Sequence, residues 1–243
     1  AKLTEWANVG KKHGMVQLIQ LSHPGRQCPK GLNKETVAPS AVPFSPLLAT
    51  TFATPRELRE DEILDIIQRF ATSAVICAKA GFEGIHLVCA QTYGIKDPEP
   101  YGFDAAIEFP PHNALSIENK IHKTLLNQEF TGSIFDYAKV VEEQCIKERP
   151  SYKCYETLML SWDNTARKQN HSNIFSNFSL DLYKDWLSNI AEHTFYNQNI
   201  PNEEKFVFIN AWNEWAEGNH LEPDQKWGRR YLEVTKEAIL ETS

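Results

Sequence analysis

Residues 206–218 read FVFINAWNEWAEG, a short apolar run that gives way abruptly to tryptophans, carboxamides and carboxylates. The apolar part, residues 206–209, has the composition of a buried strand. Glu214 and Glu217 follow shortly after that strand ends. In (β/α) folds, reacting groups gather at the carboxyl ends of the strands. The stretch therefore predicts a buried strand with a chemical site at its end.

Similar apolar runs alternate with helical patterns along the rest of the chain. Gly81 follows a long helical pattern that begins with Thr54 as cap, Pro55 in the first turn and Glu57 closing a capping box. Its expected inward face is Ile63, Ile67, Phe70, Ala74 and Cys77. The expected strands are 15–21, 84–89, 105–109, 156–161 and 206–209, and the expected helices are 54–79, 133–147, 182–190 and 231–240.

The order of these segments predicts the fold class. A strand, a long helix and a second strand form a βαβ unit with parallel strands. We therefore expect an α/β protein with a (β/α) TIM-type barrel in a single domain, residues 1–243. About five strands are recognisable where such a barrel needs eight, so the sequence leaves open whether the barrel is complete, incomplete or chimeric. Open sheet edges would favour a homo-oligomer.

Composition excludes several classes of protein. The chain has 243 residues, 42% of them hydrophobic, and a net charge of -7 without a basic run. This balance disfavours a nucleic-acid partner. No apolar stretch is long enough for a membrane span, and the first residues lack the apolar core of a signal peptide. We expect a glycan or another small molecule as the substrate.

The cysteines predict neither a disulfide framework nor a metal site. Five of them are scattered without CxxC spacing, and the HExxH, phosphate-loop and GxSxG motifs are absent from the sequence. Free thiols are typical of a reducing compartment, so we expect a cytoplasmic location. We expect no bound metal.

Glu214 and Glu217 are the candidate catalytic residues. Two carboxylates beside a sugar can divide acid and base work if their environments separate their pKa values. Tryptophan offers an apolar wall that raises a carboxyl pKa and a flat face on which a sugar stacks. Asn213 and Trp215 are therefore candidate substrate contacts. The alternative is that both glutamates are loop charges beside core tryptophans.

A second motif follows the expected strand at 156–161. SWDNTAR, residues 161–167, again places a tryptophan, a carboxylate, a carboxamide and a cation after an apolar run. The alternative is a capping aspartate with a solvated arginine. A further hypothesis is that His112 and His220 meet in one pocket and assist proton transfer.

The last 140 residues or so resemble WbsX-type lipopolysaccharide-biosynthesis proteins, which are related to glycoside hydrolase family 99. The resemblance rests on GFDAAIEFPPH (102–112), SWDNTAR (161–167) and INAWNEWAEGNHLEPDQKWGRRYLE (209–233). It implies an eight-stranded (β/α) barrel, with Glu217 as general acid/base. It also implies that Glu214 deprotonates the neighbouring sugar 2-hydroxyl, giving a transient 1,2-anhydro sugar. The implied sugar-lining residues are Asp104, Trp162, Asp163, Asn164 and Arg167.

The first 90 residues resemble a different barrel family, the old-yellow-enzyme flavin oxidoreductases. The resemblance rests on WANVGKKHGMVQLIQLSHPGRQ (6–27) and AGFEGIHL (80–87). It implies FMN and NAD(P)H chemistry, with Gln20 contacting the flavin. The two positions where that family places its substrate-binding imidazoles hold Val88 and Gln91 instead.

The chain therefore reads as a flavin-oxidoreductase-like fragment, residues 1–90, followed by a glycan-active WbsX-like fragment, residues 91–243. Either the chain is a chimera of two barrel proteins or one resemblance misleads. The leading hypothesis is a glycan-active enzyme, a hydrolase or a glycosyltransferase, that uses no cofactor. The alternatives are an FMN-dependent oxidoreductase and a folded chimera without activity.

Overall fold

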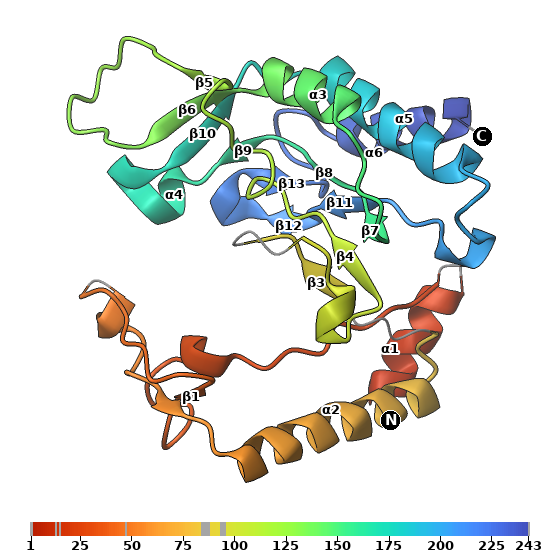
Figure 1. Ribbon diagram of the computed structural model, residues 1–243. Helices are drawn as coiled ribbons and strands as arrows, with labels where there is room; N and C mark the ends of the chain where they lie inside the picture. Colours follow the sequence, from red (N-terminus) through yellow and green to blue (C-terminus); the bar gives the residue numbers. More distant parts are fainter. Residues whose placement is uncertain are drawn as a thin grey trace. The chain divides into compact units, whose positions relative to one another are not determined.

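The computed structural model describes residues 2–12, 14, 16–46, 48–83, 88–92 and 96–242 (Figure 1). The chain divides into two compact units, residues 1–86 and 87–243. No helix in the described ranges has the length and apolar character that crossing a membrane requires.

The first unit contains two helices and a looped segment between them. Helix α1 (Lys2–Lys11) and helix α2 (Glu60–Ala80) pack around a small core of Ala7, Cys77, Ala80 and Phe82. The loop carries β1 (Val37–Ala38) and β2 (Arg56–Glu57), which pair in parallel. Helix α2 ends at Gly81, whose φ of 104° is the left-handed conformation that glycine adopts without strain. The predicted end of this helix is confirmed.

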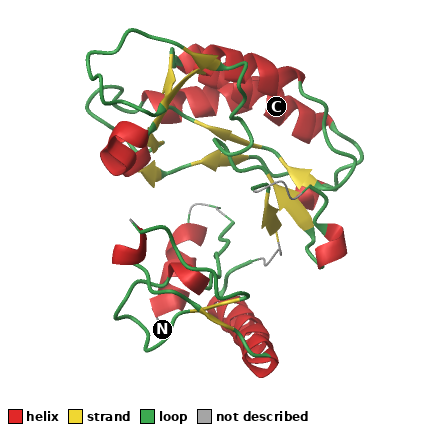
Figure 2. Ribbon diagram, turned by 60° about the vertical axis from the view of Figure 1, so that its left-hand side comes forward, coloured by secondary structure: helices red, strands yellow, loops and turns green. Residues whose placement is uncertain are grey.

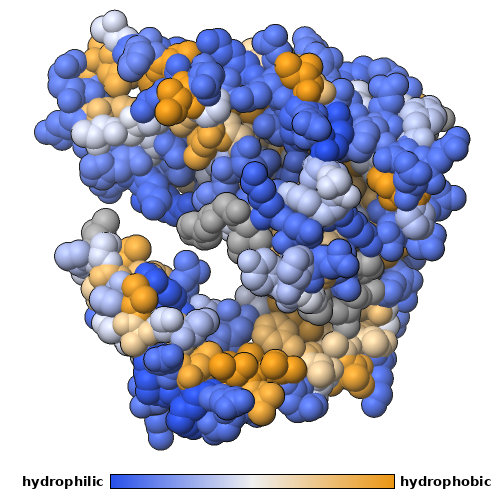
Figure 3. Space-filling view, viewed as in Figure 1, coloured by the Kyte–Doolittle hydropathy of each residue, from blue (hydrophilic) through white to orange (hydrophobic). Residues whose placement is uncertain are grey.

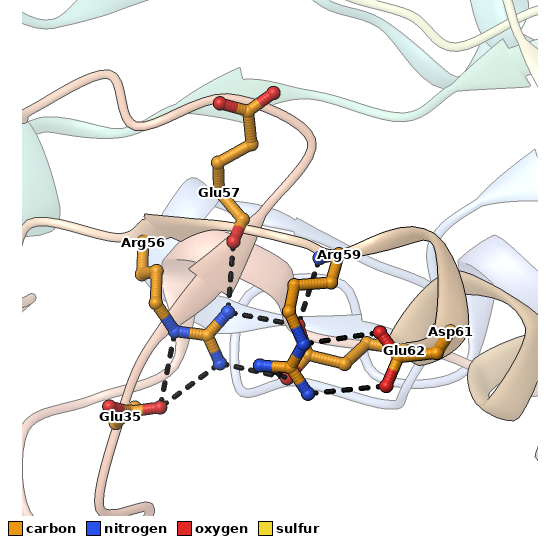
Figure 4. A network of polar contacts seen from close by, with 6 residues as sticks. All are labelled: Glu35, Arg56, Glu57, Arg59, Asp61 and Glu62. Atoms are coloured by element: carbon orange, nitrogen blue, oxygen red, sulfur yellow. Dashed lines mark hydrogen bonds and ion pairs between the residues drawn. The ribbon is translucent and has the colours of Figure 1, made fainter.

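The predicted start of α2 is wrong by several residues. Arg56 donates its backbone N–H to Thr36 O and so belongs to the β1–β2 pair rather than to a helix. The capping box forms later, where the Glu62 carboxylate accepts the Arg59 N–H at 2.9 Å. Figure 4 shows the Arg56 guanidinium between Glu35 and Glu62, at 3.0 and 2.9 Å. The hydrogen bond from Arg56, reinforced by the Arg59 N–H, lowers the pKa of Glu62 to about 2. These long-range ion pairs override the local capping signal.

The expected inward face of α2 is buried only near its end. Cys77 is 4% exposed, whereas Ile63 and Ile67 are 43% and 58% exposed. Leu64, Val75 and Ile76 are also more than half exposed, and Figure 3 shows the apolar surface that gathers along this helix. The helical period is right, but no sheet of the described part of this unit covers the face.

The predicted βαβ unit is not formed in the described residues. Between residues 16 and 21 only Leu18 makes a β-bridge, and Met15 lies outside the described residues. The expected strand 84–89 also falls largely outside them, and β3 covers Val88–Ala90. Of the predicted strand, helix and second strand, the helix is confirmed, β3 overlaps the end of the second strand at Val88 and Cys89, and the rest of that strand lies outside the described residues.

Parallel strands in chain order form the centre of the second unit. β3 pairs with β4 (Ala105–Ile107), and β4 pairs with β7 (Cys154–Tyr155). After Glu156 the chain continues as β8 (Thr157–Met159), which pairs with β11 (Phe208–Asn210). Neighbouring parallel strands in sequence order are the arrangement of a (β/α) barrel. In the described residues the strands do not close, so the structure shows a mixed α/β fold and not a complete barrel.

Three helices cover one face of these strands (Figures 1 and 2). They are α3 (Tyr137–Ile146), α5 (Leu180–Tyr196) and α6 (Arg230–Thr242). Fully buried Leu158 and Met159 of β8 pack there with Trp186 of α5, and the Tyr137 hydroxyl donates to Met159 O at 2.8 Å. The predicted strands 105–109, 156–161 and 206–209 and the predicted helices 182–190 and 231–240 are confirmed within a few residues at their ends.

The helix expected at 133–147 begins later than predicted. Residues Ser133–Asp136 form β6, which pairs in parallel with β10 (Asn173–Ser176). β5 (Lys120–Ile121) and β9 (Trp162–Asp163) complete this sheet in antiparallel pairings. Asp136 then caps α3 by accepting the Ala138 N–H at 3.1 Å. A strand partner about 40 residues away is invisible to a local helical pattern, which explains the error.

The remaining short elements follow β9 and β11. α4 (Thr165–Lys168) comes directly after β9. β12 (Asn213–Glu214) and β13 (Asn219–His220) form an antiparallel hairpin after β11. A 3₁₀ turn, Trp215–Glu217, joins these two strands and ends at Gly218 with φ 60°.

Candidate functional site

The two polar motifs of the sequence meet in the second unit. Ser161 donates its hydroxyl to Gly218 O at 2.6 Å, which ties the residue before β9 to the β12–β13 hairpin. A Cβ on Gly218 would stand 3.2 Å from the backbone N and O of Asp163. Only a glycine allows this close approach at a positive φ. FVFINAWNEWAEG and SWDNTAR therefore build one site.

A third segment joins them at the end of β4. Asn210, the last residue of β11, donates its side-chain amide to Pro110 O at 2.7 Å. His112 follows two residues later and stacks on Phe109, with ring centroids 5.8 Å apart. The carboxyl ends of β4, β8 and β11 thus supply neighbouring groups, as the parallel order of these strands requires.

Glu217 is the buried acid of this site. It is 8% exposed and forms an ion pair with Arg167 of α4. Burial raises its pKa, the positive charges of Arg167 and His112 lower it, and Glu214 raises it; the net pKa lies above the ordinary value. Glu214, by contrast, is exposed at the end of β12. The two carboxylates therefore differ in environment, which is the condition for separate acid and base roles.

Trp215 lies beside this acid pair with half of its side chain exposed, at 49%. Its indole stacks on the His220 ring at 3.8 Å and 19°, and its Nε1 donates to Glu222 at 2.8 Å. The His220 ring contacts Asp224 through Nε2 at 2.9 Å. His220 is thus held by Asp224, while His112 lies near Glu217. The structure gives no contact that brings the two histidines into one pocket among the described residues.

Other predicted substrate residues differ in how open they are to a ligand. Trp162 and Asn164 are each 6% exposed, and the Asn164 carboxamide already accepts the Asn173 N–H. Asp163 and Arg167 are exposed at the start and end of the adjoining turn, and Asp163 accepts the Thr165 N–H at 3.0 Å. Asn213 is exposed in β12. The groups that a ligand can reach are therefore Asp163, Arg167, Asn213, Glu214 and Trp215.

Asp104 and Gln20 are the remaining predicted site residues. Asp104 directly precedes β4, at its amino end, and its charge contributes to the raised pKa of Tyr155. Gln20 is exposed in the first unit. Sequence reasoning missed Trp212, which is 51% exposed, and Glu222, the acceptor for the Trp215 indole. The tryptophan doublet of AWNEW signalled the former, and no local pattern signals the latter.

A separate cavity of about 380 Å³ lies near Tyr155, Glu156 and His193 and shares no lining residue with the acid pair. Its charged residues pair with one another. The Glu156 carboxylate contacts His193 Nδ1 at 2.5 Å and Arg149 Nε at 3.3 Å, and Lys153 pairs with Glu204 at 2.7 Å. Because these charges are already paired with one another, we assign this cavity no chemistry.

The fold and the site together define an α/β protein with an acid pair at the carboxyl ends of parallel strands. Comparison with known proteins gives the family. Residues 58–235 match the family model described as Glycosyltransferase WbsX, so the chain belongs to the WbsX family. Residues 2–97 also match the NADH:flavin oxidoreductase / NADH oxidase family. Both resemblances read from the sequence are confirmed, and the two matches overlap over residues 58–97.

Individual relatives match either the WbsX-like part or the flavin-oxidoreductase-like part of the chain. The uncharacterized protein WxcX of Xanthomonas campestris pv. campestris (strain B100) is 36% identical over 165 residues, which cover 67% of this chain and 23% of WxcX. The NADH-dependent flavin oxidoreductase iliE of Hypocrea jecorina (strain QM6a) is 36% identical over 110 residues, 40% of this chain and 27% of that protein. The chain thus spans about a quarter of the length of these relatives.

One solved structure, a glycoside hydrolase-like protein, is also similar. It aligns with 69% of this chain and 47% of its own, at a TM-score of 0.38 and 18% identity. This likeness is too distant to support a conclusion.

Proposed function

We propose that this protein acts on glycosidic bonds, with Glu217 as general acid/base and Glu214 as the base for the neighbouring sugar hydroxyl. The observation that carries the proposal is the contrast between the two carboxylates: Glu217 is buried with a raised pKa and Glu214 is exposed in the same hairpin. Membership of the WbsX family supports a glycan as the substrate class.

The proposed first step breaks the bond between the anomeric carbon and the glycosidic oxygen. Protonated Glu217 gives its proton to that oxygen, while the sugar 2-oxygen attacks the anomeric carbon and passes its proton to Glu214. The product of this step is a 1,2-anhydro sugar with no bond to the protein. In the second step a water or a sugar hydroxyl attacks the anomeric carbon and breaks its bond to the 2-oxygen, while Glu217 takes the incoming proton and Glu214 returns a proton to the 2-oxygen. Two displacements retain the anomeric configuration.

Arg167 and His112 would act on the proton exchange of the Glu217 carboxyl during these two steps. Burial raises the pKa of the Glu217 carboxyl above its ordinary value, which favours the protonated form that the first step needs, and Arg167 opposes that rise. The choice between hydrolysis and transfer depends on whether water or a sugar hydroxyl enters the second step. Both outcomes use the same acid and base.

Dependence on the leaving group tests the proposal. Glu217→Gln should lower turnover of α-mannan by ~10²–10⁴-fold, the usual contribution of a general acid. It should slow the first step on an aryl α-mannoside with a good leaving group much less, because that group departs without a proton. Glu192→Gln replaces an exposed carboxylate of α5 and serves as the matched control. Equal losses on both substrates, or no loss, would contradict the assigned role.

Two positions of the flavin-oxidoreductase resemblance argue against a flavin-dependent reaction. Gln20 is exposed, and of the two positions that would recognise an oxidoreductase substrate, Val88 lies in β3 and carries no polar group. The other, Gln91, donates its side-chain amide to Lys96 O and to the Tyr152 hydroxyl, each at 2.9 Å. We therefore propose that the reaction on the glycan uses no cofactor. Retention of the visible flavin absorption band after incubation with FMN and desalting would overturn this part of the proposal.

A further inference from the structure

The indole of Trp215 is held on one face and along its polar edge. The His220 ring lies parallel to it, with centroids 3.8 Å apart and planes at 19°. Glu222 accepts the indole N–H at 2.8 Å. Because 49% of the residue remains exposed, the face opposite His220 is open to solvent. Exposed tryptophans are usually free to change rotamer, whereas this one is fixed by two independent contacts.

His220 is itself fixed from several directions. It is 9% exposed, its Nε2 contacts the Asp224 carboxylate at 2.9 Å, and the Tyr231 ring packs edge-on at 5.8 Å. Since a carboxylate only accepts hydrogen bonds, Nε2 carries the proton. Strand pairing of His220 with Asn213 sets the ring beside the turn that carries Trp215. Asp224 in turn accepts a hydrogen bond from the Trp227 N–H.

A fixed open indole suits one kind of ligand. The axial C–H groups of a pyranose ring form an apolar face that packs on an aromatic ring. An aromatic group already held in place loses little conformational entropy on binding, so more of the contact energy appears as affinity. The acid pair Glu214 and Glu217 lies in the same hairpin, so a sugar on Trp215 would stand beside the proposed reacting groups.

The charges around Trp215 favour neutral sugars over anionic ones. Glu222 accepts the Trp215 indole N–H and Glu214 directly precedes Trp215 in the chain, while Arg167 is paired with Glu217. The carboxylates of Glu214 and Glu222 would repel a carboxylate or phosphate on the ligand. A neutral sugar meets no such cost.

We infer that Trp215 is the stacking platform for a ring of a neutral hexopyranoside, and that the His220–Asp224 pair is the positioning device that holds this platform. The inference rests on the proposed function, since it takes a glycan as the substrate class. His220 and Asp224 do not contact the ligand, and they act through the orientation of the indole.

Calorimetric titration of the full chain tests the platform, in the Glu217→Gln background so that the ligand is not consumed. The probes are neutral mannan, glucan and galactan oligosaccharides, with polygalacturonate oligosaccharides as the anionic comparison. At least one neutral probe should bind, and Trp215→Ala should raise its Kd by roughly tenfold or more. Trp6→Ala removes an equally exposed tryptophan, 58% exposed in the first unit, and should leave the Kd unchanged. An unchanged Kd in Trp215→Ala, or equally tight binding of the anionic probe, would overturn the inference.

A separate set of variants tests whether His220 positions Trp215. His220→Ala should weaken binding as Trp215→Ala does, whereas His220→Phe keeps a stacked ring and should restore most of the affinity. The near-ultraviolet circular dichroism that Trp215 contributes, measured as the difference from Trp215→Phe, should follow the same order. If His220→Ala and His220→Phe bind equally, the stack plays no positioning role. Binding that does not depend on Trp215 would overturn the platform alone, whereas unchanged turnover in Glu214→Gln and Glu217→Gln would overturn the proposed function alone.

Discussion

The guanidinium of Arg167 pairs with the buried carboxylate of Glu217 across two segments that are far apart in the sequence. Arg167 comes from the short helix after β9, and Glu217 from the turn between β12 and β13. This ion pair joins the SWDNTAR and NEWAEG motifs into one electrostatic unit. Burial raises the pKa of the proposed general acid, and Arg167 is the strongest influence that opposes this rise.

Replacing Arg167 by Gln should move the pH profile in a defined direction. Burial would then act on Glu217 with less opposition, so its pKa should rise further. A general acid works in its protonated form, and the alkaline limb of kcat/KM should therefore shift to higher pH. Arg167→Lys keeps the charge and should shift the limb less. A limb that stays in place, or moves to lower pH, would contradict the coupling between these two residues.

Asp224 should make stability depend on pH below about 4, the ordinary aspartate pKa. Burial raises its pKa, but hydrogen bonds from the Trp227 N–H and His220 lower it more, and the net pKa is below the ordinary value. A depressed folded-state pKa stabilises the fold above the unfolded pKa and ceases to do so as pH falls through the folded pKa. The difference in Tm between wild type and Asp224→Asn should thus shrink as pH falls below ~4. A difference that is constant across this range would show that the Asp224 charge is not involved.

Gly218→Ala should harm both stability and turnover. Gly218 has φ 60°, and its new Cβ would meet the Asp163 backbone at 3.2 Å. An alanine in this conformation costs about 1–2 kcal/mol, and the contact with Asp163 should displace the acid pair. Gly228→Ala is the matched control, because Gly228 has φ 58° with nothing within 4 Å. Both variants should unfold at lower urea concentration, but only Gly218→Ala should lose turnover. Equal turnover in both would refute the close approach.

Asp136→Ala should weaken the start of α3. The Asp136 carboxylate accepts the Ala138 N–H at 3.1 Å, and loss of such a cap costs ~1 kcal/mol. Asp136→Ser retains a capping oxygen and should recover most of that loss. Urea unfolding followed by circular dichroism measures the difference. An alanine variant as stable as the serine variant would mean that the cap contributes nothing.

The sequence predicted the elements whose information is local. The strand at 206–209 and the helix around Trp186 carry their apolar pattern within a few residues, and both are present in the structure. The start of α2 and the strand Ser133–Asp136 were missed because Arg56 and β6 take partners about 20 and 40 residues away. Tertiary pairing of this kind overrides a local helical signal.

Only part of the candidate site could be predicted from the sequence. The resemblance to WbsX-type proteins implied that Arg167 lines the same pocket as Glu217, and the structure pairs the two side chains. The fixing of Trp215 by His220 and Glu222 was not predictable, since it depends on the hairpin register. Asp104 was assigned to the site by resemblance, and the structure places it at the amino end of β4.

We propose that Glu217 and Glu214 together cleave or transfer a glycosidic bond. The most direct test is a proton NMR time course of α-mannan oligosaccharide with wild type, Glu217→Gln and Glu192→Gln. We predict a new anomeric signal of retained configuration with wild type and with Glu192→Gln, and none with Glu217→Gln. Equal product formation by wild type and Glu217→Gln, or an unchanged spectrum with all three proteins, would contradict the claim.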